Sequence, residues 1–233
     1  ILTHHNSRLT FPPAMFRLFD MAIAGYVAIS PEIEAVYRKY ARRPVQQIRN
    51  AAGACFRVPG ARGGPRFPPR ILAVGAVSDQ KNYDLLIDTA LALRTRLPDE
   101  RMPVFTIAGG GDGLEQLRAR VEATGLEKWV HFLGERRDIK EMMAQNDVLF
   151  NSSLYEGMAI SMIEALSMGL PVVATPVPGN LTMVSDGVSG ILAKAAEATS
   201  LADALIEAME NTELYHSLSR GALTESHQYS IDT

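Results

Sequence analysis

From residue 71 onward, short apolar runs alternate with longer segments in which apolar residues recur every three or four positions. The runs have the length of buried strands, and the segments have the period of amphipathic helices. Strands are predicted at residues 71–74, 104–108, 130–133, 148–150, 171–174 and 190–192. Helices are predicted near 83–96, 113–124, 137–145, 158–168, 180–185 and 199–209. Apolar strands separated by helices predict a parallel sheet covered on both faces, so the fold class is α/β, Rossmann-like and doubly wound.

The first 70 residues show the same alternation over shorter distances. Strands are predicted at residues 1–3 and 45–48, and a helix at 32–41. Ser30 suits the N-cap of this helix, and Pro31 suits its first turn. Residues 53–70 are rich in Gly, Pro and Arg without periodicity, as in a linker. We therefore predict a partial N-terminal α/β segment with its linker over residues 1–70, and a complete domain that folds without it over residues 71–233.

Composition narrows the class of protein. Of the 233 residues, 47% are hydrophobic and 21% are charged, as in an ordinary globular protein. The single Cys55 excludes an internal disulfide, and no Cys/His cluster has metal-ligand spacing, so we expect no metal. No apolar window reaches the roughly 18 residues that span a bilayer. The default location is the cytoplasm.

The net charge of −3 hides an asymmetry along the chain. Residues 1–70 hold eleven Lys or Arg and three Asp or Glu, whereas residues 71–233 hold twelve and twenty-three. A basic segment beside an acidic domain is consistent with peripheral contact to the inner face of a membrane or with an anionic acceptor. Arginines that merely solvate loops and helix ends explain the asymmetry equally well. Without interleaved aromatic residues, the basic run does not indicate a nucleic-acid partner.

The strongest chemical signal is the string YEGMAISMIEALSMGLPVVAT, which begins at Tyr155. Its glutamates, Glu156 and Glu164, stand eight positions apart around the start of a predicted helix. Backbone N–H groups at a helix start favour phosphate. A carboxylate two turns along can accept hydrogen bonds from vicinal hydroxyls such as those of ribose, and a carboxylate before the helix can face a sugar. The ordinary alternative is two solvated glutamates on a buried helix.

This string resembles the Glu-x7-Glu signature of retaining glycosyltransferases of family 4 (glycosyl transferases group 1), which have the GT-B fold. The resemblance is densest between residues 71 and 192. It implies a nucleotide-sugar donor site in which Glu156 is catalytic and Glu164 binds ribose. It also implies donor contacts from the four residues at the helix start: Gly157, Met158, Ala159 and Ile160.

The loop after the first strand of the domain reads GAVSDQK and runs from Gly75 to Lys81. In the resembling family this loop carries an Arg and, five residues later, a Lys, and both contact the donor diphosphate. Lys81 matches the Lys, so the resemblance assigns it to the diphosphate, where it stabilises the leaving group without a metal. Ala76 stands in place of the Arg, and Asn82 stands where a Gly commonly follows the Lys. The alternative for Lys81 is a solvated residue at a helix start.

Two further loops are placed beside the nucleotide by the resemblance. The glycines at 109–111 follow the second strand, where Gly110 is a predicted donor contact, although a plain tight turn explains them equally well. Gly134 and Arg136 follow the third strand, and in related enzymes the residues after this glycine lie along the base. Arg136 can stack on a base, but the sequence does not fix which base.

The segment around His4 and His5 resembles the part of the family's N-terminal domain that carries a catalytic-site histidine. His5 aligns best with that residue, which lies across the cleft and contacts the donor sugar. Asn50 and Ala51 stand where the family has Asn-Gly, and Thr182 stands in place of a usual glutamate. We read residues 178–190 as structural turns.

The resemblance implies a metal-independent retaining enzyme that moves a hexose from a nucleoside-diphosphate sugar to a hydroxyl acceptor on a glycan or glycolipid, in cell-envelope synthesis. No cofactor is expected beyond the donor substrate. The chain reads as an N-terminally incomplete protein, which leaves a nucleotide-sugar-binding module without turnover as an alternative. A GT-B sugar-nucleotide epimerase is the less favoured third hypothesis.

Overall fold

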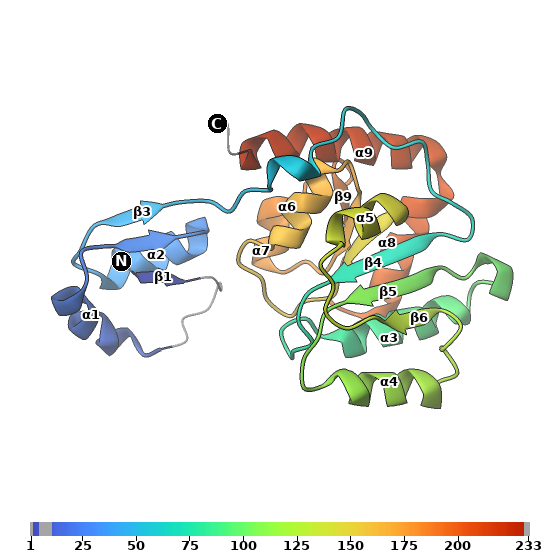
Figure 1. Ribbon diagram of the computed structural model, residues 1–233, viewed down its shortest axis with the longest axis horizontal. Helices are drawn as coiled ribbons and strands as arrows, with labels where there is room; N and C mark the ends of the chain where they lie inside the picture. The colour runs from blue at the N-terminus through green and yellow to red at the C-terminus, as the bar shows by residue number, and fades with distance from the viewer. Residues whose placement is uncertain (1, 5–10, 231–233) are drawn as a thin grey trace.

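The computed structural model describes residues 2–4 and 11–230 of the chain. These residues form two parallel sheets, one of three strands near the N-terminus and one of six strands in the remainder (Figure 1). Helices flank both sheets. The α/β, Rossmann-like class predicted from the alternation of strands and helices is therefore confirmed.

The small sheet has the order β1-β2-β3, with β1 at Leu2–His4, β2 at Tyr26–Ala28 and β3 at Val45–Gln47. Two helices pack beside it, α1 (Phe16–Ala22) and α2 (Pro31–Tyr40). As predicted, the Ser30 hydroxyl caps α2 by accepting a hydrogen bond from the Ile33 N–H. Phe16, Tyr26 and Tyr37 form an aromatic core that is fully buried. The predicted strand at 1–3 and helix at 32–41 lie within one residue of the observed ones.

The six strands of the large sheet fall where the apolar runs predicted them. They are β4 (Arg70–Val74), β5 (Val104–Ala108), β6 (Val130–Phe132), β7 (Val148–Asn151), β8 (Val172–Ala174) and β9 (Gly190–Leu192). Every pairing is parallel, and the spatial order is β6-β5-β4-β7-β8-β9. The order reverses between β4 and β7, and such a switch point is where open α/β sheets bind ligands.

Helices cover both faces of this sheet. They are α3 (Tyr83–Arg94), α4 (Leu114–Ala123), α5 (Ile139–Gln145), α6 (Ile160–Ser167), α7 (Pro178–Met183), α8 (Ala198–Glu210) and α9 (Thr212–Ser226). Single 3-10 turns lie at η1 (Pro13–Met15), η2 (Ala54–Phe56), η3 (Asp99–Arg101) and η4 (His227–Tyr229). The sequence pattern did not predict α9, which follows α8 after one residue.

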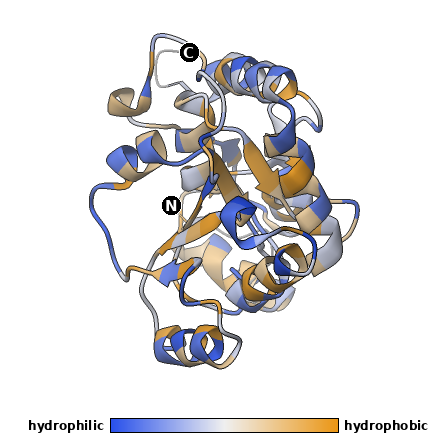
Figure 2. Cartoon of the chain, turned by 90° about the vertical axis from the view of Figure 1, so that its right-hand side faces the viewer, coloured by the Kyte–Doolittle hydropathy of each residue, from blue (hydrophilic) through white to orange (hydrophobic). Residues whose placement is uncertain are grey.

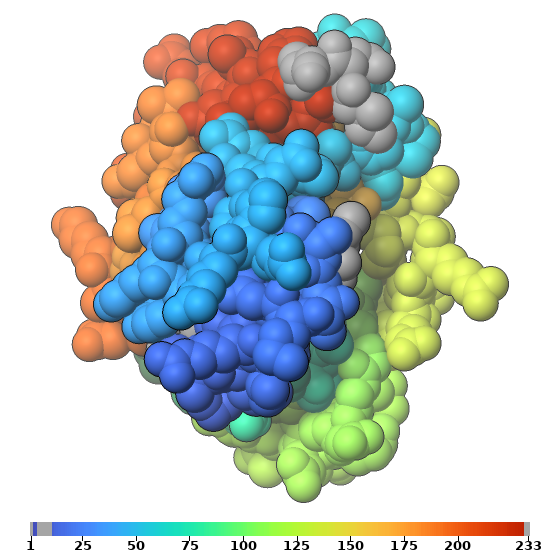
Figure 3. Space-filling model, turned by 90° about the vertical axis from the view of Figure 1, so that its left-hand side faces the viewer, coloured from blue at the N-terminus to red at the C-terminus, as the bar shows by residue number. Residues whose placement is uncertain are grey.

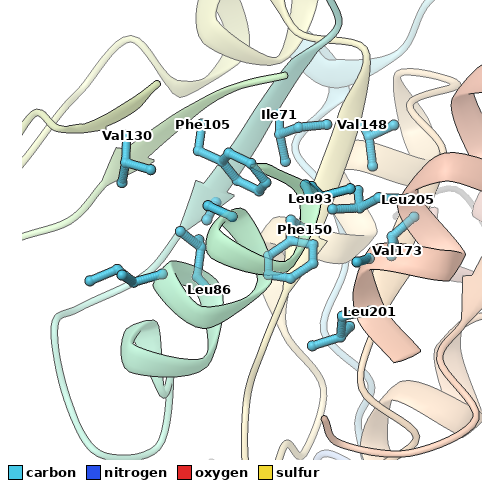
Figure 4. Close-up of a cluster of buried hydrophobic side chains, with 14 of the residues drawn as sticks. Ile71, Leu86, Leu93, Phe105, Val130, Val148, Phe150, Val173, Leu201 and Leu205 are labelled. Carbon is cyan, nitrogen blue, oxygen red and sulfur yellow. The ribbon is translucent and has the colours of Figure 1, made fainter. Parts of the chain in front are cut away.

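Period-two alternation along the strands divides the interior into two cores. Ile71 and Phe105 face α3 and α8, where they meet Leu86 and Leu205 (Figure 4). Leu72, the neighbour of Ile71, faces the opposite core with residues of α5 and α6. In Figure 2 the apolar strands lie inside, and the hydrophilic positions of the helices face outward. Because both faces are covered, most residues of the strands are apolar, as the sequence indicated.

The Gly- and Pro-rich linker packs on the large domain as a strap. Its Arg62 guanidinium donates hydrogen bonds to the carbonyl oxygens of Met143 (2.8 Å), Asn146 (2.8 Å) and Met168 (3.2 Å), at the C-terminal ends of α5 and α6. The Arg66 guanidinium is 2.9 Å from the Asp147 carboxylate. These arginines satisfy helix-end carbonyls and a buried charge, so part of the basic excess in residues 1–70 is structural.

We expect Arg62→Met to lower the free energy of unfolding by at least about 2 kcal/mol, because three carbonyls would lose charged hydrogen-bond donors. Urea unfolding at pH 7 measures this change. Arg220→Met is the matched control, since Arg220 is exposed on α9 with no side-chain hydrogen bond to the described residues. Equal stability of the two variants would show that the strap is dispensable.

Candidate active site

The loops after β4 and β7 meet at the switch point of the large sheet. The carboxyl ends of β4, β5 and β6 point toward the small N-terminal sheet (Figure 1). Hydrogen bonds to backbone carbonyls join the two loops: Ser152 Oγ donates to the Lys81 carbonyl (2.8 Å), Leu154 N to the Gln80 carbonyl (2.8 Å), and Gln80 Nε2 to the Tyr155 carbonyl (3.1 Å). The backbone therefore holds the side chains of Lys81 and Glu156 close together.

Lys81 and Glu156 form a largely buried ion pair. The Lys81 Nζ atom lies 2.5 Å from Glu156 Oε1, and the side chains are 17% and 5% exposed. The readings of Lys81 as a solvated helix-start residue and of Glu156 as a solvated glutamate are therefore wrong. Desolvation of both charges is costly, so a pair of this kind requires further hydrogen bonds to its polar atoms.

Those hydrogen bonds come from the end of β7. Ser153 Oγ donates to Glu156 Oε1 at 2.7 Å, and Asn151 Nδ2 approaches the same oxygen at 3.4 Å. Gln80 Nε2 lies 3.4 Å from Glu156 Oε2. The sequence analysis missed these partners, because Ser and Asn at a strand end carry no distinctive spacing.

Gly179 fixes the backbone beneath Glu156. A Cβ atom at this position would lie 2.4 Å from the Glu156 carbonyl oxygen and 2.7 Å from the Gly157 carbonyl oxygen. No side chain fits there without moving the loop. Nearby, Thr182 Oγ1 lies 3.1 Å from Glu32 Oε1 of α2 and donates to it. Residues 178–182 are therefore more than the structural turns expected, since they support Glu156 and contact the N-terminal segment.

A cavity of about 380 Å³ opens beside the ion pair, and we call it the Lys81 cavity. Its lining residues are Asn50, Val74, Gly75, Lys81, Met158, Ala159, Ile160, Ser161 and Glu164. A second cavity of about 300 Å³, the Arg136 cavity, is lined by Val74, Gly75, Ala76, Ala108, Gly109, Gly110, Glu135, Arg136 and Ile139. The two cavities share Val74 and Gly75, so they lie side by side, and together we call them the cleft.

Most of the predicted donor-binding residues thus line one cleft. Among the exceptions, Glu156 lies behind Lys81, and Gly157 is buried beside it without lining either cavity. Gly134 has a backbone role, with a φ of 71° and a carbonyl that accepts from the Gly109 N–H (2.8 Å). The predicted catalytic His5 lies outside the described residues.

The first loop explains one departure from the family pattern. Asn82 precedes α3 with φ 49° and ψ 53°, the left-handed conformation that Gly adopts freely and Asn tolerates. Asn82 can therefore replace the usual Gly without a change of backbone. Gly75 lies close to the Lys81 stem, because a Cβ atom there would be 2.5 Å from Lys81 Cε.

Arg136, which the sequence analysis expects beside the base, is already paired. Arg136 Nε and Nη2 contact the Asp138 carboxylate at 2.8 and 2.5 Å. This pair raises the pKa of Arg136 and lowers that of Asp138. Both side chains are exposed, so the pair contributes little to stability. The flat face of the guanidinium stays available for stacking.

The N-terminal segment reaches the cleft through Asn50. Its Nδ2 atom donates to the Met158 carbonyl oxygen at 2.9 Å, across 108 positions of sequence. Viewed from the side of the small sheet, the N-terminal segment lies across the front of the large domain (Figure 3). The sequence placed Asn50 in a family-like segment but assigned it no contact with the site.

Glu164 carries the clearest pKa shift in the cleft. Burial raises the pKa of its carboxyl from 4.5 to about 7. The group is half-buried on α6 and faces the Lys81 cavity. Near neutral pH it changes between a hydrogen-bond donor and a carboxylate that only accepts.

This shift predicts a pH dependence of stability. The folded protein holds the Glu164 proton more tightly than the unfolded chain does, so between pH 4.5 and about 7 the folded state binds more protons. The contribution of the protonated Glu164 carboxyl to the free energy of unfolding is therefore fully present below pH 4.5 and is lost as pH rises to about 7. Urea unfolding between pH 4.5 and about 7 should show that the free energy of unfolding declines less with rising pH in Glu164→Gln than in the wild-type chain. Identical slopes would contradict the assignment.

Within residues 2–4 and 11–230, no group of three or more His, Cys, Asp or Glu side chains could hold a metal ion. In the same residues, no helix is both long and apolar enough to cross a membrane.

The cleft can be compared with known proteins. The chain matches the family model for glycosyl transferases group 1 over residues 63–224. It is 33% identical over 168 residues to the D-inositol 3-phosphate glycosyltransferase of Jonesia denitrificans, an alignment that covers 70% of this chain and 40% of that protein. It is 31% identical over 160 residues to the mannosylfructose-phosphate synthase of Agrobacterium fabrum, covering 64% and 35%. The chain spans about two-fifths or less of the length of these curated relatives.

Solved structures share the fold over almost the whole chain. Anabaena HepE, crystallised with UDP and glucose, has a TM-score of 0.80 at 22% identity and covers 99% of this chain and 68% of its own. A variant of S. aureus TarM has a TM-score of 0.81 at 20% identity, with coverage of 99% and 48%. At such identities the likeness shows the GT-B fold alone. The match over residues 63–224 shows more, and the chain belongs to the glycosyl transferases group 1 family.

Proposed function

We propose that the cleft is the donor site of a retaining, family 4 glycosyltransferase, which moves a hexose from a nucleoside-diphosphate sugar to a hydroxyl acceptor. The observation that carries the proposal is the meeting of Lys81, Glu164 and the start of α6 around one cavity at the switch point of the sheet. A cation, uncapped helix N–H groups and a carboxylate are complementary to the diphosphate and ribose of such a donor.

In this proposal each part of the donor has a partner. The diphosphate lies against Lys81, Gly75 and the backbone at Met158, Ala159 and Ile160. The ribose hydroxyls donate to Glu164. The sugar lies on the side of the Lys81 cavity nearest Glu156 and Gly157, which stand behind the residues that line it. The base extends past Gly110 toward Gly134 and Arg136.

The chemistry proposed is same-face substitution without a metal or other cofactor. The bond from the sugar C1 to the phosphate oxygen breaks, and the acceptor oxygen bonds to C1 on the same face. The acceptor proton passes to the departing phosphate, whose charge Lys81 stabilises. Ala76 lacks the second cation that the family usually places in this loop, so leaving-group stabilisation rests more heavily on Lys81.

Two alternatives make different predictions. A nucleotide-sugar-binding module would bind the donor without turnover, and an epimerase would change the donor without an acceptor. Product analysis with and without a glycan or glycolipid acceptor separates all three. The Glu156 and Glu164 string argues against the epimerase.

We also propose a cytoplasmic location, with peripheral membrane contact through residues 1–70. In support, Leu18 and Met21 on α1 are 63% and 80% exposed, and Arg17 lies beside them in sequence. Apolar residues beside basic ones suit an anionic lipid surface. Sedimentation with anionic and neutral vesicles tests this, and equal partition to both would count against it.

Replacing Glu164 with Leu should weaken nucleoside diphosphate binding by about 1–3 kcal/mol, the scale of a charge-assisted hydrogen bond. The effect follows from the loss of the ribose acceptor. Calorimetry with UDP, GDP and ADP measures it, and circular dichroism checks the fold of the variant. Unchanged affinity for the preferred nucleotide would remove Glu164 from the site.

A further inference from the structure

The Arg136 cavity contains a carboxylate that the proposed reaction does not use. Glu135 lines this cavity, and its side chain lies along Gly110. A Cβ atom on Gly110 would be 2.9 Å from Glu135 Cγ and 3.5 Å from Glu135 Oε1. The glycine therefore leaves room for the carboxylate at the end of the cleft where the base is proposed to lie.

Of the charged side chains that line this cavity, Arg136 is paired within the described residues and Glu135 is not. The Arg136 guanidinium is held on two of its nitrogens by Asp138. Lys81, in the adjoining cavity, is paired with Glu156. Glu135 has neither an ion pair nor a hydrogen bond to any of the described residues, so it presents an unpaired acceptor to the cavity. Glu135 is exposed, so a base that supplies hydrogen-bond donors can pair with its carboxylate.

The Watson–Crick edges of the bases differ in that respect. An ionised carboxylate has two oxygens and only accepts hydrogen bonds. Guanine offers two adjacent donors, N1–H and the N2 amino group, which match the two oxygens. Uracil presents a single N3–H between two carbonyl oxygens, which a carboxylate repels. Adenine places an acceptor, N1, beside its amino group. Bidentate, charge-assisted pairing is therefore available to guanine alone among these three.

We propose that Glu135 makes the donor site selective for guanine, so that the substrate class is a GDP-linked hexose. The inference rests on the proposed donor site and adds the identity of its base. Arg136, anchored by Asp138, can cover a face of the ring, and Ile139 supplies an apolar wall of the same cavity.

Calorimetry on the chain with GDP, UDP and ADP tests the selectivity. We expect GDP to bind at least about tenfold more tightly than UDP or ADP, because the other bases leave the Glu135 carboxylate without two donors. Glu135→Gln should weaken GDP binding by about tenfold or more and change UDP binding little, since the amide presents a donor where the base also has one. Glu141→Gln is the matched control, because Glu141 is exposed on α5 and lines neither cavity.

The outcomes separate the guanine assignment from the donor site on which it rests. UDP or ADP binding as tightly as GDP would overturn the guanine assignment and leave the donor site in place. An equal loss for all three nucleotides in Glu135→Gln would also overturn it. If none of the three binds, the proposed donor site is itself wrong, and the assignment fails with it.

Discussion

Lys81→Met should lower the free energy of unfolding by about 3 kcal/mol, because it leaves the buried Glu156 carboxylate without its cation. The effect is large because the Glu156 side chain is only 5% exposed and Lys81 Nζ is 2.5 Å away. Urea unfolding at pH 7 measures the change. The double variant Lys81→Met, Glu156→Gln should recover most of the loss, since it removes both charges together.

The matched control is the exposed pair of Arg101 and Glu210, whose closest atoms are 2.8 Å apart. Both side chains are nearly half exposed, so Arg101→Met should cost less than about 1 kcal/mol. If the double variant at Lys81 and Glu156 is as unstable as Lys81→Met alone, the unpaired Glu156 carboxylate is not the cause of the instability of Lys81→Met.

Transfer should depend on the N-terminal half far more than donor binding does. The N-terminal segment holds a sheet of three strands and contacts the large domain through side chains such as Asn50 and Glu32. A larger second domain excludes water and orients the acceptor. A version of the 233-residue chain extended at its N-terminus to a full first domain should transfer hexose at least about 100-fold faster than the chain itself, with similar donor affinity. Equal rates would show that residues 1–70 suffice.

The large domain could be predicted well because its signals are local. Each strand is a short apolar run, and each helix between strands repeats its apolar positions. The left-handed Gly169, with φ 58°, ends α6 where the sequence placed the helix end. The strand order was not predicted by periodicity, because it depends on how crossovers pack in space.

The linker shows where local signals stop. Arg62 lies in a stretch whose composition indicates only an irregular connection, yet its side chain joins the ends of two helices more than 80 positions away. Nothing in the spacing of Gly, Pro and Arg encodes those partners. A contact of this kind depends on tertiary structure, so sequence patterns indicate the linker but not the strap.

The sequence singles out the charged residues Lys81, Glu156 and Glu164, but not the neutral residues that support Glu156. Glu156 and Glu164 stand out by spacing, and Lys81 by its place after a strand. Ser153 and Gly179 support Glu156 through a hydroxyl and through the absence of a side chain. Ser and Gly are common in every loop, so their roles become visible only in three dimensions.

The donor site is tested most directly by nucleotide-sugar affinity in two double variants that should both fold. Calorimetry would compare the chain with Lys81→Met, Glu156→Gln in the cleft and with Arg101→Met, Glu210→Gln outside it, using the hexose donor of the preferred base. We predict at least about a tenfold loss of affinity in the cleft variant, because a charged diphosphate partner is removed, and wild-type affinity in the surface variant. Wild-type affinity in the cleft variant would contradict the assignment of this cleft to the donor.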